Sequence, residues 1–188
     1  MAGEWSRIAR RIRVPLGFVF AAFFLWLARP SAEFLAWSLL LVVPGLWLRG
    51  YASGYVKKNA EVTMTGPYAH TRNPLYLGSM LMAFGFALAA RSVWIAVALA
   101  VLFAVIYIPV IRSEEAFLRS RFDGYEAYAE RVPRLVPRLR PARAEAGNAG
   151  GGFSGALYRK HREYNALIGA AALYAALILK LCLWHGAS

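Results

Sequence analysis

The sequence is poor in cysteine, histidine and acidic residues. It has one cysteine, Cys182, with three histidines and ten acidic residues in a chain of 188. A lone cysteine excludes an internal disulfide and a cysteine metal cluster, and we expect Cys182 to be a small buried apolar residue. The sequence also lacks helix-turn-helix and zinc-finger spacings, so the net charge of +12 does not indicate nucleic-acid binding. No Gly-rich loop joins a strand to a helix, which argues against a Rossmann-type site.

Long apolar runs are what the chain has instead. Five blocks of 15 to 19 residues are Val14–Ala28, Ala32–Leu48, Leu75–Ala90, Val93–Ile111 and Ala166–Trp184. A membrane-spanning helix needs about 17–25 residues, and flanking Arg and Lys side chains can extend the shorter blocks by snorkelling. The first block follows a basic leader, but Arg29 and Pro30 fit poorly with signal-peptide cleavage, which favours a retained helix. The sequence therefore predicts an all-α polytopic membrane protein with five transmembrane helices.

The basic residues fall mainly into every second loop. If the N-terminus is cytoplasmic and each block crosses once, 19 of the 22 lie on the cytoplasmic side. Only Arg29, Arg91 and Lys180 lie on the other side. This asymmetry is typical of membrane proteins, and it explains the positive charge by contact with anionic headgroups. We expect a multi-pass protein of the bacterial inner membrane with a cytoplasmic N-terminus and membrane lipids as partners, and we leave its oligomeric state open.

Local patterns refine this outline. Pro44-Gly45 predicts a kink in the second helix. From Phe117 to Val132 the pattern predicts an amphipathic helix, interrupted near Gly124, that lies along the membrane or caps the bundle from the cytoplasm. A Gly-rich stretch follows and is typical of a flexible linker. The predicted domains are a four-helix core with its cap at 1–143, a linker at 144–155 and a fifth transmembrane helix at 156–188.

A turn-rich motif at residues 66–78, Gly-Pro-Tyr-Ala-His-Thr-Arg-Asn-Pro-Leu-Tyr-Leu-Gly, precedes the third block. Asn73 as a capping residue and Pro74 at the first helical position predict a helix start. The unpaired amides and the helix dipole favour an anion there, with Arg72 beside it. The alternative is an ordinary turn at the membrane surface, with Arg72 bound to headgroups.

Two glutamates, Glu114 and Glu115, follow the fourth block just after Pro109. Adjacent helical residues point about 100° apart, so at most one of them faces a given pocket. The alternative is a pair of surface contacts, from Arg112 to Glu115 and from Glu115 to Arg119, at helical spacing.

The motif and the two glutamates together resemble the integral-membrane methyltransferase superfamily, which includes isoprenylcysteine carboxyl methyltransferases and phospholipid N-methyltransferases. The resemblance covers about Leu48 to Pro137 and includes the trailing Tyr-x-x-Tyr and Arg-Val-Pro of residues 125–133. The family often has Arg-His-Pro where this chain has Arg-Asn-Pro, and His70 is not the positional equivalent of that histidine. The resemblance implies S-adenosylmethionine as the cofactor, bound at the cytoplasmic end of the third and fourth helices.

Each part of this cofactor has a matching residue type. Arg72 and the amides after Pro74 suit its carboxylate. Glu114 or Glu115 suits its ammonium or ribose hydroxyls. Two tyrosines can pack on the adenine or face the sulfonium. The predicted catalytic residues are Arg72, Glu115 and His70, and the predicted cofactor-binding residues are Val62, Tyr68, His70, Arg72, Asn73, Pro74, Tyr76, Leu77, Gly78, Glu114 and Glu115, with no metal ligands.

Methyl transfer is an in-line displacement, so alignment of the reacting atoms supplies most of the catalysis. We expect S-adenosylmethionine-dependent methylation of a lipophilic acceptor at the cytoplasmic membrane face, such as an isoprenylcysteine-like carboxylate. The alternatives are a phospholipid amine, a small thiol, or a membrane scaffold without enzyme activity. An amine or thiol must lose a proton, for which His70 is the nearest candidate base.

Overall fold

The computed structural model describes residues 21–56, 62–142 and 152–185, and every regular element in these ranges is a helix. A helical stretch at 21–27 comes first. The elements that follow are α2 (Ala32–Ser53), the 3₁₀ turn η1 (Gly66–Ala69), α3 (Pro74–Ala90), α4 (Val93–Leu102), the π-helical turn η2 (Phe103–Tyr107), α5 (Ile108–Arg121), α6 (Tyr125–Arg131), α7 (Gly155–Lys160) and α8 (Tyr164–His185).

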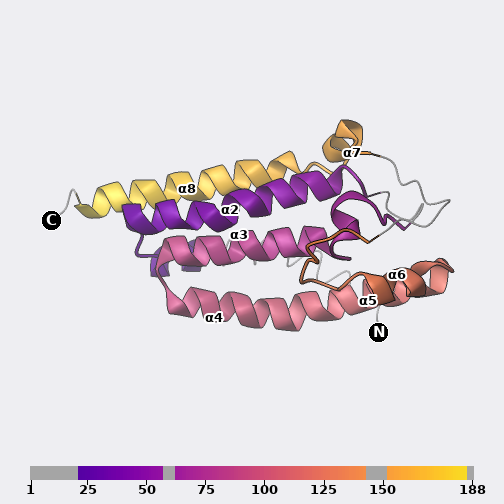
Figure 1. Cartoon of the computed structure of the whole chain (residues 1–188). Coiled ribbons are helices and arrows are strands. Elements are labelled where there is room, and N and C mark those ends of the chain that lie inside the picture. The colour runs from indigo at the N-terminus through magenta and orange to yellow at the C-terminus, as the bar shows by residue number, and fades with distance from the viewer. Residues whose placement is uncertain (1–20, 57–61, 143–151, 186–188) are drawn as a thin grey trace, which may run out of the picture.

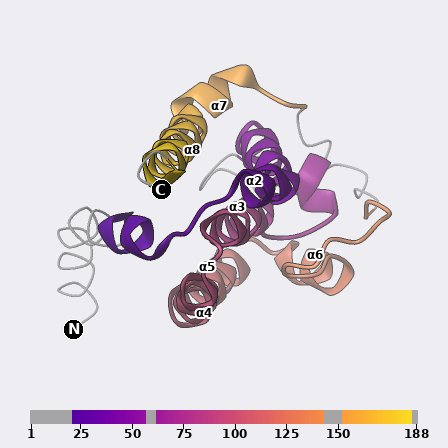
Figure 2. The same ribbon diagram turned by 90° about the vertical axis from the view of Figure 1, so that its left-hand side faces the viewer.

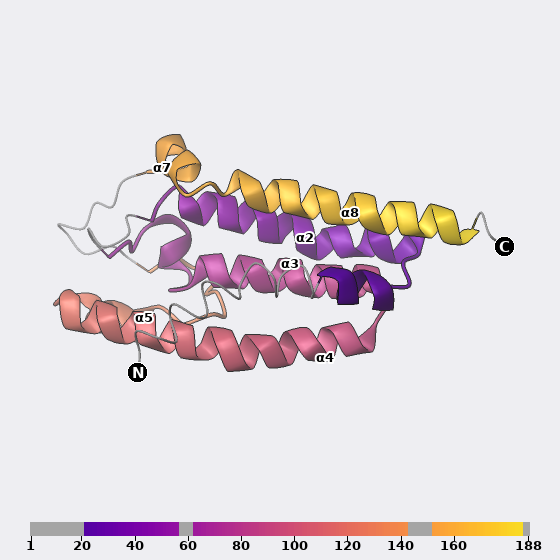
Figure 3. The ribbon, with the colours of Figure 1, turned by 180° about the vertical axis from the view of Figure 1, so that it is seen from behind.

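The long helices run side by side along one direction. Figure 1 shows α8 lying along α2, α2 along α3, and α4 with α5 along the other side of α3. The view from behind shows the same order (Figure 3). The short connection at 91–92 makes α3 and α4 antiparallel neighbours, and a second short connection, 28–31, leads from the stretch 21–27 into α2. We call the end with these two connections and the C-terminus of α8 the hairpin end, and the end with η1, α6 and α7 the motif end.

Small residues bring α2 and α3 into close contact. A Cβ atom added at Gly45 would lie 2.7 Å from the Gly78 carbonyl oxygen, and one added at Gly78 would lie 2.7 Å from the Gly45 oxygen. At Gly85 an added Cβ would lie 2.6 Å from a Val42 methyl carbon. Helices in lipid associate through such close packing, because the hydrophobic effect contributes little to helix association there.

The predicted all-helical membrane fold is confirmed. Three helical segments in the described ranges are long and apolar enough to span a membrane: Ala32–Ser53, Val93–Arg121 and Tyr164–Trp184. The helix Pro74–Ala90 is shorter, at 17 residues. Most of the first predicted block, Val14–Ala28, lies outside the described residues, so the predicted count of five spans is not confirmed.

The fourth predicted helix continues beyond the membrane-length block. α4, η2 and α5 form one segment of 29 residues, Val93–Arg121. In the wide turn the amide of Ile108 donates to the carbonyl of Phe103, just before Pro109, which has no amide proton to give. The segment ends before Gly124, which is the N-cap of α6, so the predicted interruption of the amphipathic helix is confirmed.

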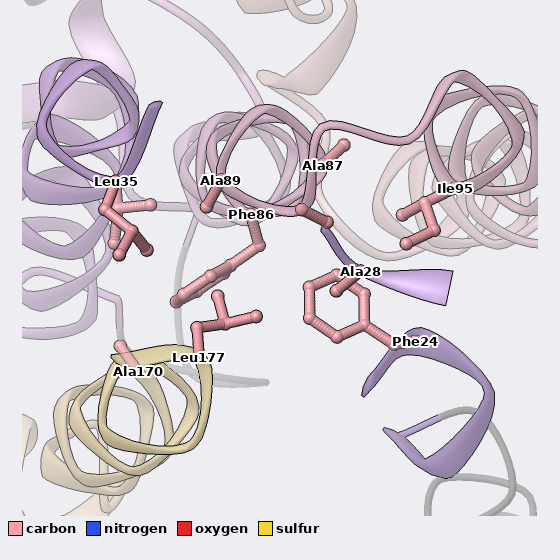
Figure 4. Close-up of a cluster of buried hydrophobic side chains, with 11 residues drawn as sticks. Phe24, Ala28, Leu35, Phe86, Ala87, Ala89, Ile95, Ala170 and Leu177 are labelled. Atoms are coloured by element: carbon pink, nitrogen blue, oxygen red, sulfur yellow. The ribbon is translucent and has the colours of Figure 1, made fainter. Parts of the chain in front are cut away.

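Two separate apolar clusters hold the bundle and its cap. The larger joins α2, α3, α4, α8 and the stretch 21–27, and Figure 4 shows Phe86 of α3 between Leu35 and Leu177. The smaller lies at the motif end, where Tyr125, Tyr128 and Val132 pack with Val62 and Met64. α6 therefore caps the bundle, which is one of the two placements predicted for it.

Three details differ from the sequence prediction. α2 runs to Ser53, beyond the predicted end at Leu48. α7 begins at Gly155, inside the predicted linker, because the Ser154 hydroxyl caps it by accepting from the Leu157 amide; residues 144–151 of that linker lie outside the described ranges. Cys182 is exposed on α8, so its predicted burial is wrong. A membrane helix such as α8 that packs on the bundle by one face exposes the residues of its other face to lipid.

The stretch 21–27 stands to one side of the bundle, joined to α2 by the first connection (Figure 2).

The C-terminal helix is tied to the bundle by polar contacts as well as by apolar ones. Arg49 of α2 forms a two-pronged ion pair with Glu163, with nitrogen–oxygen distances of 2.9 to 3.1 Å. Further along, the hydroxyls of Ser38 and Tyr174 lie 2.7 Å apart.

Candidate functional site

The motif 66–78 folds as a tight turn followed by the start of α3. Gly66 has a φ of +59°, a conformation that favours glycine, and an added Cβ would also strike the Tyr55 ring. Pro67 then opens η1, and its carbonyl accepts from the amides of His70 and Thr71 at 3.1 and 3.2 Å. The turn places the residues after it at the first turn of α3.

A strap after α6, residues 132–142, binds this motif along its length. The amide of Arg72 donates to the Pro133 carbonyl at 3.0 Å, and the amide of Arg138 donates to the His70 carbonyl at 3.0 Å. The amide of Ala142 donates to the Ala69 carbonyl at 2.9 Å. In Figure 1 the strap is the orange segment that runs back from α6 past the start of α3. The motif therefore depends on a segment 60 residues later for its shape.

Asn73 is the N-cap residue of α3, but its side chain does not cap the helix. Its amide nitrogen Nδ2 instead donates to the Arg134 carbonyl at 3.0 Å. The prediction that Asn73 accepts from the first-turn amides is therefore wrong, because the strap competes for the same side chain. Pro74 occupies the first helical position as predicted, and the amides after it have no side-chain cap.

Glu115 lies at the centre of an ion-pair cluster. Its side chain is 3% exposed. Arg134 of the strap donates from Nε and Nη2 to both carboxylate oxygens at 2.7 to 3.1 Å. Arg72 Nη1 lies 3.5 Å from Glu115 Oε1. The helical pairs with Arg112 and Arg119 that the alternative predicted are not the contacts of Glu115 here, because the side chain points inward to the strap.

Arg72 is the unusual member of this cluster. Its side chain is 10% exposed, yet Nε and Nη1 have no hydrogen-bond partner. A buried guanidinium with unused donors carries an energetic cost that a bound acceptor would relieve. It lies at the N-terminus of α3, where the helix dipole favours an anion. Of these two donors, Nη1 has the 3.5 Å ion-pair contact with Glu115, whereas Nε has no partner.

Glu114 has a different environment from its neighbour. It is exposed, and its Oε1 accepts a hydrogen bond from the Tyr76 hydroxyl at 3.0 Å. The Tyr76 ring packs edge-on against Tyr107, with centroids 5.5 Å apart. The two glutamates therefore face different surroundings, one held by arginines and one with a carboxylate open to further donors.

Tyr68 and His70 lie on the same turn. Tyr68 is buried, its carbonyl accepts from the Tyr128 hydroxyl at 2.8 Å, and burial raises the pKa of its own hydroxyl above the usual range. The hydroxyl therefore stays protonated and can donate. The Nδ1 atom of His70 lies 2.8 Å from the Arg138 carbonyl. A carbonyl only accepts, so Nδ1 carries the proton and the neutral ring has its lone pair on Nε2.

The remaining predicted residues occupy supporting positions. Val62 packs in the cap cluster rather than beside Arg72. The Leu77 amide donates to the Asn73 carbonyl at 3.0 Å, which closes the first turn of α3. Gly78 lies against α2 and sets the distance between the two helices.

Two residues of the cluster were not predicted. Arg134 supplies the main contacts to Glu115, and buried Thr71 donates to the strap carbonyls of Arg134 and Leu135 at 3.2 Å. The signal for Arg134 was its position just after the Arg-Val-Pro of the resemblance, between two prolines. Only the tertiary fold indicates that this segment returns to the motif.

An apolar cavity of about 180 Å³ opens one turn further along α3. Ser79, Met80, Phe103 and Tyr107 are among the residues that line it, so it lies between α3 and the η2 turn. Ligand pockets are usually about 300–1,000 Å³, so this one has room for part of a ligand. Tyr107 belongs both to this cavity and to the tyrosine pair beside Glu114.

Comparison with known proteins bears on this region directly. Residues 45–124 match the family model described as phospholipid methyltransferase. This segment is therefore similar to the phospholipid methyltransferase family, over less than half of the chain. It includes α2 from Gly45, the motif, α3 and both glutamates, whereas the strap follows it.

Two curated relatives also match. The chain is 37% identical over 107 residues to the nickel-cobalt-cadmium resistance protein NccN of Alcaligenes xylosoxydans xylosoxydans. It is 38% identical over 107 residues to the cobalt-zinc-cadmium resistance protein CzcN of Cupriavidus metallidurans. Each match covers 57% of this chain and 49% of the relative, so the chain spans about half the length of these proteins. No solved structure matches.

Two side chains of the segment 45–124 could hold parts of S-adenosylmethionine. The unused donors of Arg72 suit the cofactor's carboxylate, and the exposed carboxylate of Glu114 suits its ammonium or a ribose hydroxyl. Within the described residues, no group of three His, Cys, Asp or Glu side chains could hold a metal ion.

Proposed function

We propose that this membrane protein transfers a methyl group from S-adenosylmethionine to a lipophilic acceptor at the cytoplasmic face of the membrane. The observation that carries the proposal is Arg72, a largely buried arginine just before α3. Its Nε atom has no hydrogen-bond partner, and its Nη1 atom has a 3.5 Å contact with Glu115. It lies inside the phospholipid methyltransferase segment. When bound, the cofactor would supply a sulfonium methyl group, which a nucleophile attacks with S-adenosylhomocysteine as the leaving group.

The residues divide into ligand contacts and positioning groups. Arg72 and the first-turn amides of α3 hold the cofactor's carboxylate. Glu114 and Tyr76 receive its cationic or hydroxyl groups, since they are hydrogen-bonded to each other at an exposed edge. Glu115 has both oxygens engaged by Arg134, so we assign it to positioning Arg72. Of the two glutamates predicted to bind the cofactor, this assignment keeps Glu114 as the contact.

The acceptor's apolar part has a place beside this site. The cavity between α3 and the η2 turn is lined mainly by apolar side chains and borders the tyrosine pair. A hydrocarbon chain entering sideways from the bilayer would place its polar head toward Glu114 and Arg72. An isoprenylcysteine-like carboxylate remains our first candidate for the head.

A phospholipid amine is the second candidate, favoured by the description of the matching family model. Mass spectrometry of a lipid extract incubated with enzyme and methyl-labelled cofactor distinguishes the two. Label in an ester supports the carboxylate, whereas label in a headgroup amine supports the phospholipid. The resistance proteins named above are similar over 57% of this chain, and we transfer no metal-related role from them.

Binding of S-adenosylhomocysteine tests the cofactor directly. We expect it to raise the melting temperature of the detergent-solubilised protein, and Arg72→Ala to abolish that rise. Arg121→Ala is the matched control, because Arg121 is an exposed arginine of α5 outside the ion pairs of Glu115. A folded wild-type protein with no rise at millimolar ligand would contradict the proposal and favour a scaffold role.

The assignment of the two glutamates has its own test. Glu114→Gln should weaken S-adenosylhomocysteine binding at unchanged stability, because its exposed side chain has one protein partner. Glu115→Gln should weaken binding and lower stability together, because the arginines lose their counter-charge. If Glu114→Gln binds the ligand as tightly as wild type, the cofactor contact does not involve Glu114.

A further inference from the structure

A second cavity lies at the hairpin end, far along the bundle from the motif. Its volume is about 390 Å³, and its walls come from both connections and from α8. The lining includes Arg29, Ser31, Arg91, Lys180, Leu181 and Trp184. The three cations in this lining are the three basic residues that the charge asymmetry leaves on this side of the membrane. They converge on one cavity although they are up to 151 positions apart in sequence.

The fold itself brings these cations together. The amide of Arg29 donates to the Ala90 carbonyl at 2.8 Å, which docks the first connection on the second. Arg91 follows directly, and its guanidinium carbon lies 4.8 Å from the centroid of the Phe34 ring. The Nζ atom of Lys180 donates to the carbonyls of Leu25 and Trp26, at the end of the stretch 21–27.

The positive charge of this cluster has no acidic partner among the described residues. Glu33, in the first turn of α2, is the acidic residue at this end in the described ranges. No ion pair joins it to any of the three cations in that part of the chain. Like charges held close together raise the energy of the folded state unless an anion joins them. An external anion would supply the missing charge.

Three tryptophans indicate the depth of the cavity in the membrane. Trp26, Trp94 and Trp184 are 75%, 75% and 58% exposed, and each lies within a few residues of one of the cations in sequence. Exposed tryptophans gather at the membrane–water interface. The cavity therefore opens at the level of the lipid phosphates, and Leu181 and Trp184 offer apolar contacts for the part of a lipid below its headgroup.

We propose that this cavity binds the phosphate of an anionic phospholipid in the leaflet at the hairpin end. Two arginines and a lysine can donate charge-assisted hydrogen bonds to the oxygens of a phosphate. Basic pockets between membrane helices are suited to such headgroups. The bound lipid would bridge the two connections and α8. This site is separate from the proposed methyl-transfer site and does not depend on it.

Lipid titration of the detergent-solubilised protein tests the proposal. The probes are dioleoyl-phosphatidylglycerol, a diacylglycerol with the same acyl chains, and inorganic phosphate. Melting temperature and native mass spectrometry measure binding. We expect phosphatidylglycerol to raise the melting temperature and to be retained as one bound lipid, with no such effect of diacylglycerol.

The variant Arg29→Gln/Arg91→Gln should bind phosphatidylglycerol about 25-fold more weakly, since each arginine near an anionic membrane surface contributes roughly fivefold in affinity. The control Arg121→Gln/Arg140→Gln removes two exposed cations at the motif end and should bind as wild type does. If the first variant does not fold, Lys180→Gln is used in its place with the same expectation.

Two outcomes would overturn the proposal. One is equal binding of phosphatidylglycerol by the wild type and by the Arg29/Arg91 or Lys180 variant. The other is saturation by inorganic phosphate that also displaces the lipid, which would make the cavity a site for a free anion.

Discussion

The two ends of the helix bundle both gather basic side chains, but they balance them differently. At the motif end Glu115 lies between Arg72 and Arg134. At the hairpin end three cations line a cavity, and no acidic side chain in the described residues pairs with them. The carboxylate of Glu115 offsets part of the charge of two arginines within the fold, whereas the three cations at the hairpin end depend on an external anion for their counter-charge.

The largest change in stability is expected when the counter-charge at the motif end is removed. Glu115→Gln should lower the free energy of unfolding by about 3 kcal/mol, because it leaves two arginines without a partner in a largely buried site. Denaturation in detergent measures this loss. Glu126→Gln, which removes one side of the exposed pair with Arg119, should cost less than about 1 kcal/mol. Equal losses in the two variants would show that burial of Glu115 adds nothing.

An effect of nearly the same size in free energy is expected on the rate of methyl transfer at the motif end. His70→Ala should slow methylation of an amine or thiol by about 100-fold, because Nε2 holds the lone pair that could accept a proton. A carboxylate acceptor is already anionic and should be slowed far less. The measurement is initial rate with each acceptor class. Equal slowing of all acceptors would remove His70 as the base.

The contact between α2 and α3 should be more sensitive than the outer face of α8. Gly78→Ala should destabilise the protein by about 2 kcal/mol, since the new Cβ would lie 2.7 Å from a backbone oxygen of α2. Gly169→Ala, where nothing lies within 4 Å of the new atom, should leave the melting temperature unchanged or raise it. A stable Gly78→Ala variant would mean that the helices can separate at no cost.

The smallest effect is expected at the hairpin end. In lipid-free detergent, Arg29→Gln/Arg91→Gln should change the free energy of unfolding by less than about 0.5 kcal/mol, because neither arginine has an acidic partner to lose. The same denaturation experiment measures it. A loss as large as that of Glu115→Gln would mean that the two ends do not differ as described.

Sequence patterns predicted the membrane helices well because hydrophobic length is a local property. The helix start at Pro74 and the interruption near Gly124 were also local signals, carried by proline and glycine. The partners of Glu115 were not predictable in the same way. The surface pairs with Arg112 and Arg119 matched helical spacing, but the strap returns from 19 residues away to supply Arg134.

The same contrast explains the errors within the motif. Asn73 has the local preference of a capping residue, yet its side chain serves a carbonyl of the strap. Cys182 belongs to an apolar run, and such a run does not say which side of a helix meets lipid. The juxtaposition of Arg29, Arg91 and Lys180 likewise depends on how two connections and α8 meet. Local chemistry predicted these elements, and tertiary contacts determined which side chains meet.

The wide turn at Phe103–Tyr107 has one more consequence. A π-helical turn accommodates one residue more than an α-helical turn, and one residue corresponds to a rotation of about 100° about the helix axis. That is also the angle between the directions of two consecutive side chains. If the same residues formed an ordinary α-helical turn, everything beyond them would therefore rotate by this angle and bring Glu114, in place of Glu115, toward Arg134. The winding of this turn therefore determines which of the two adjacent glutamates faces inward.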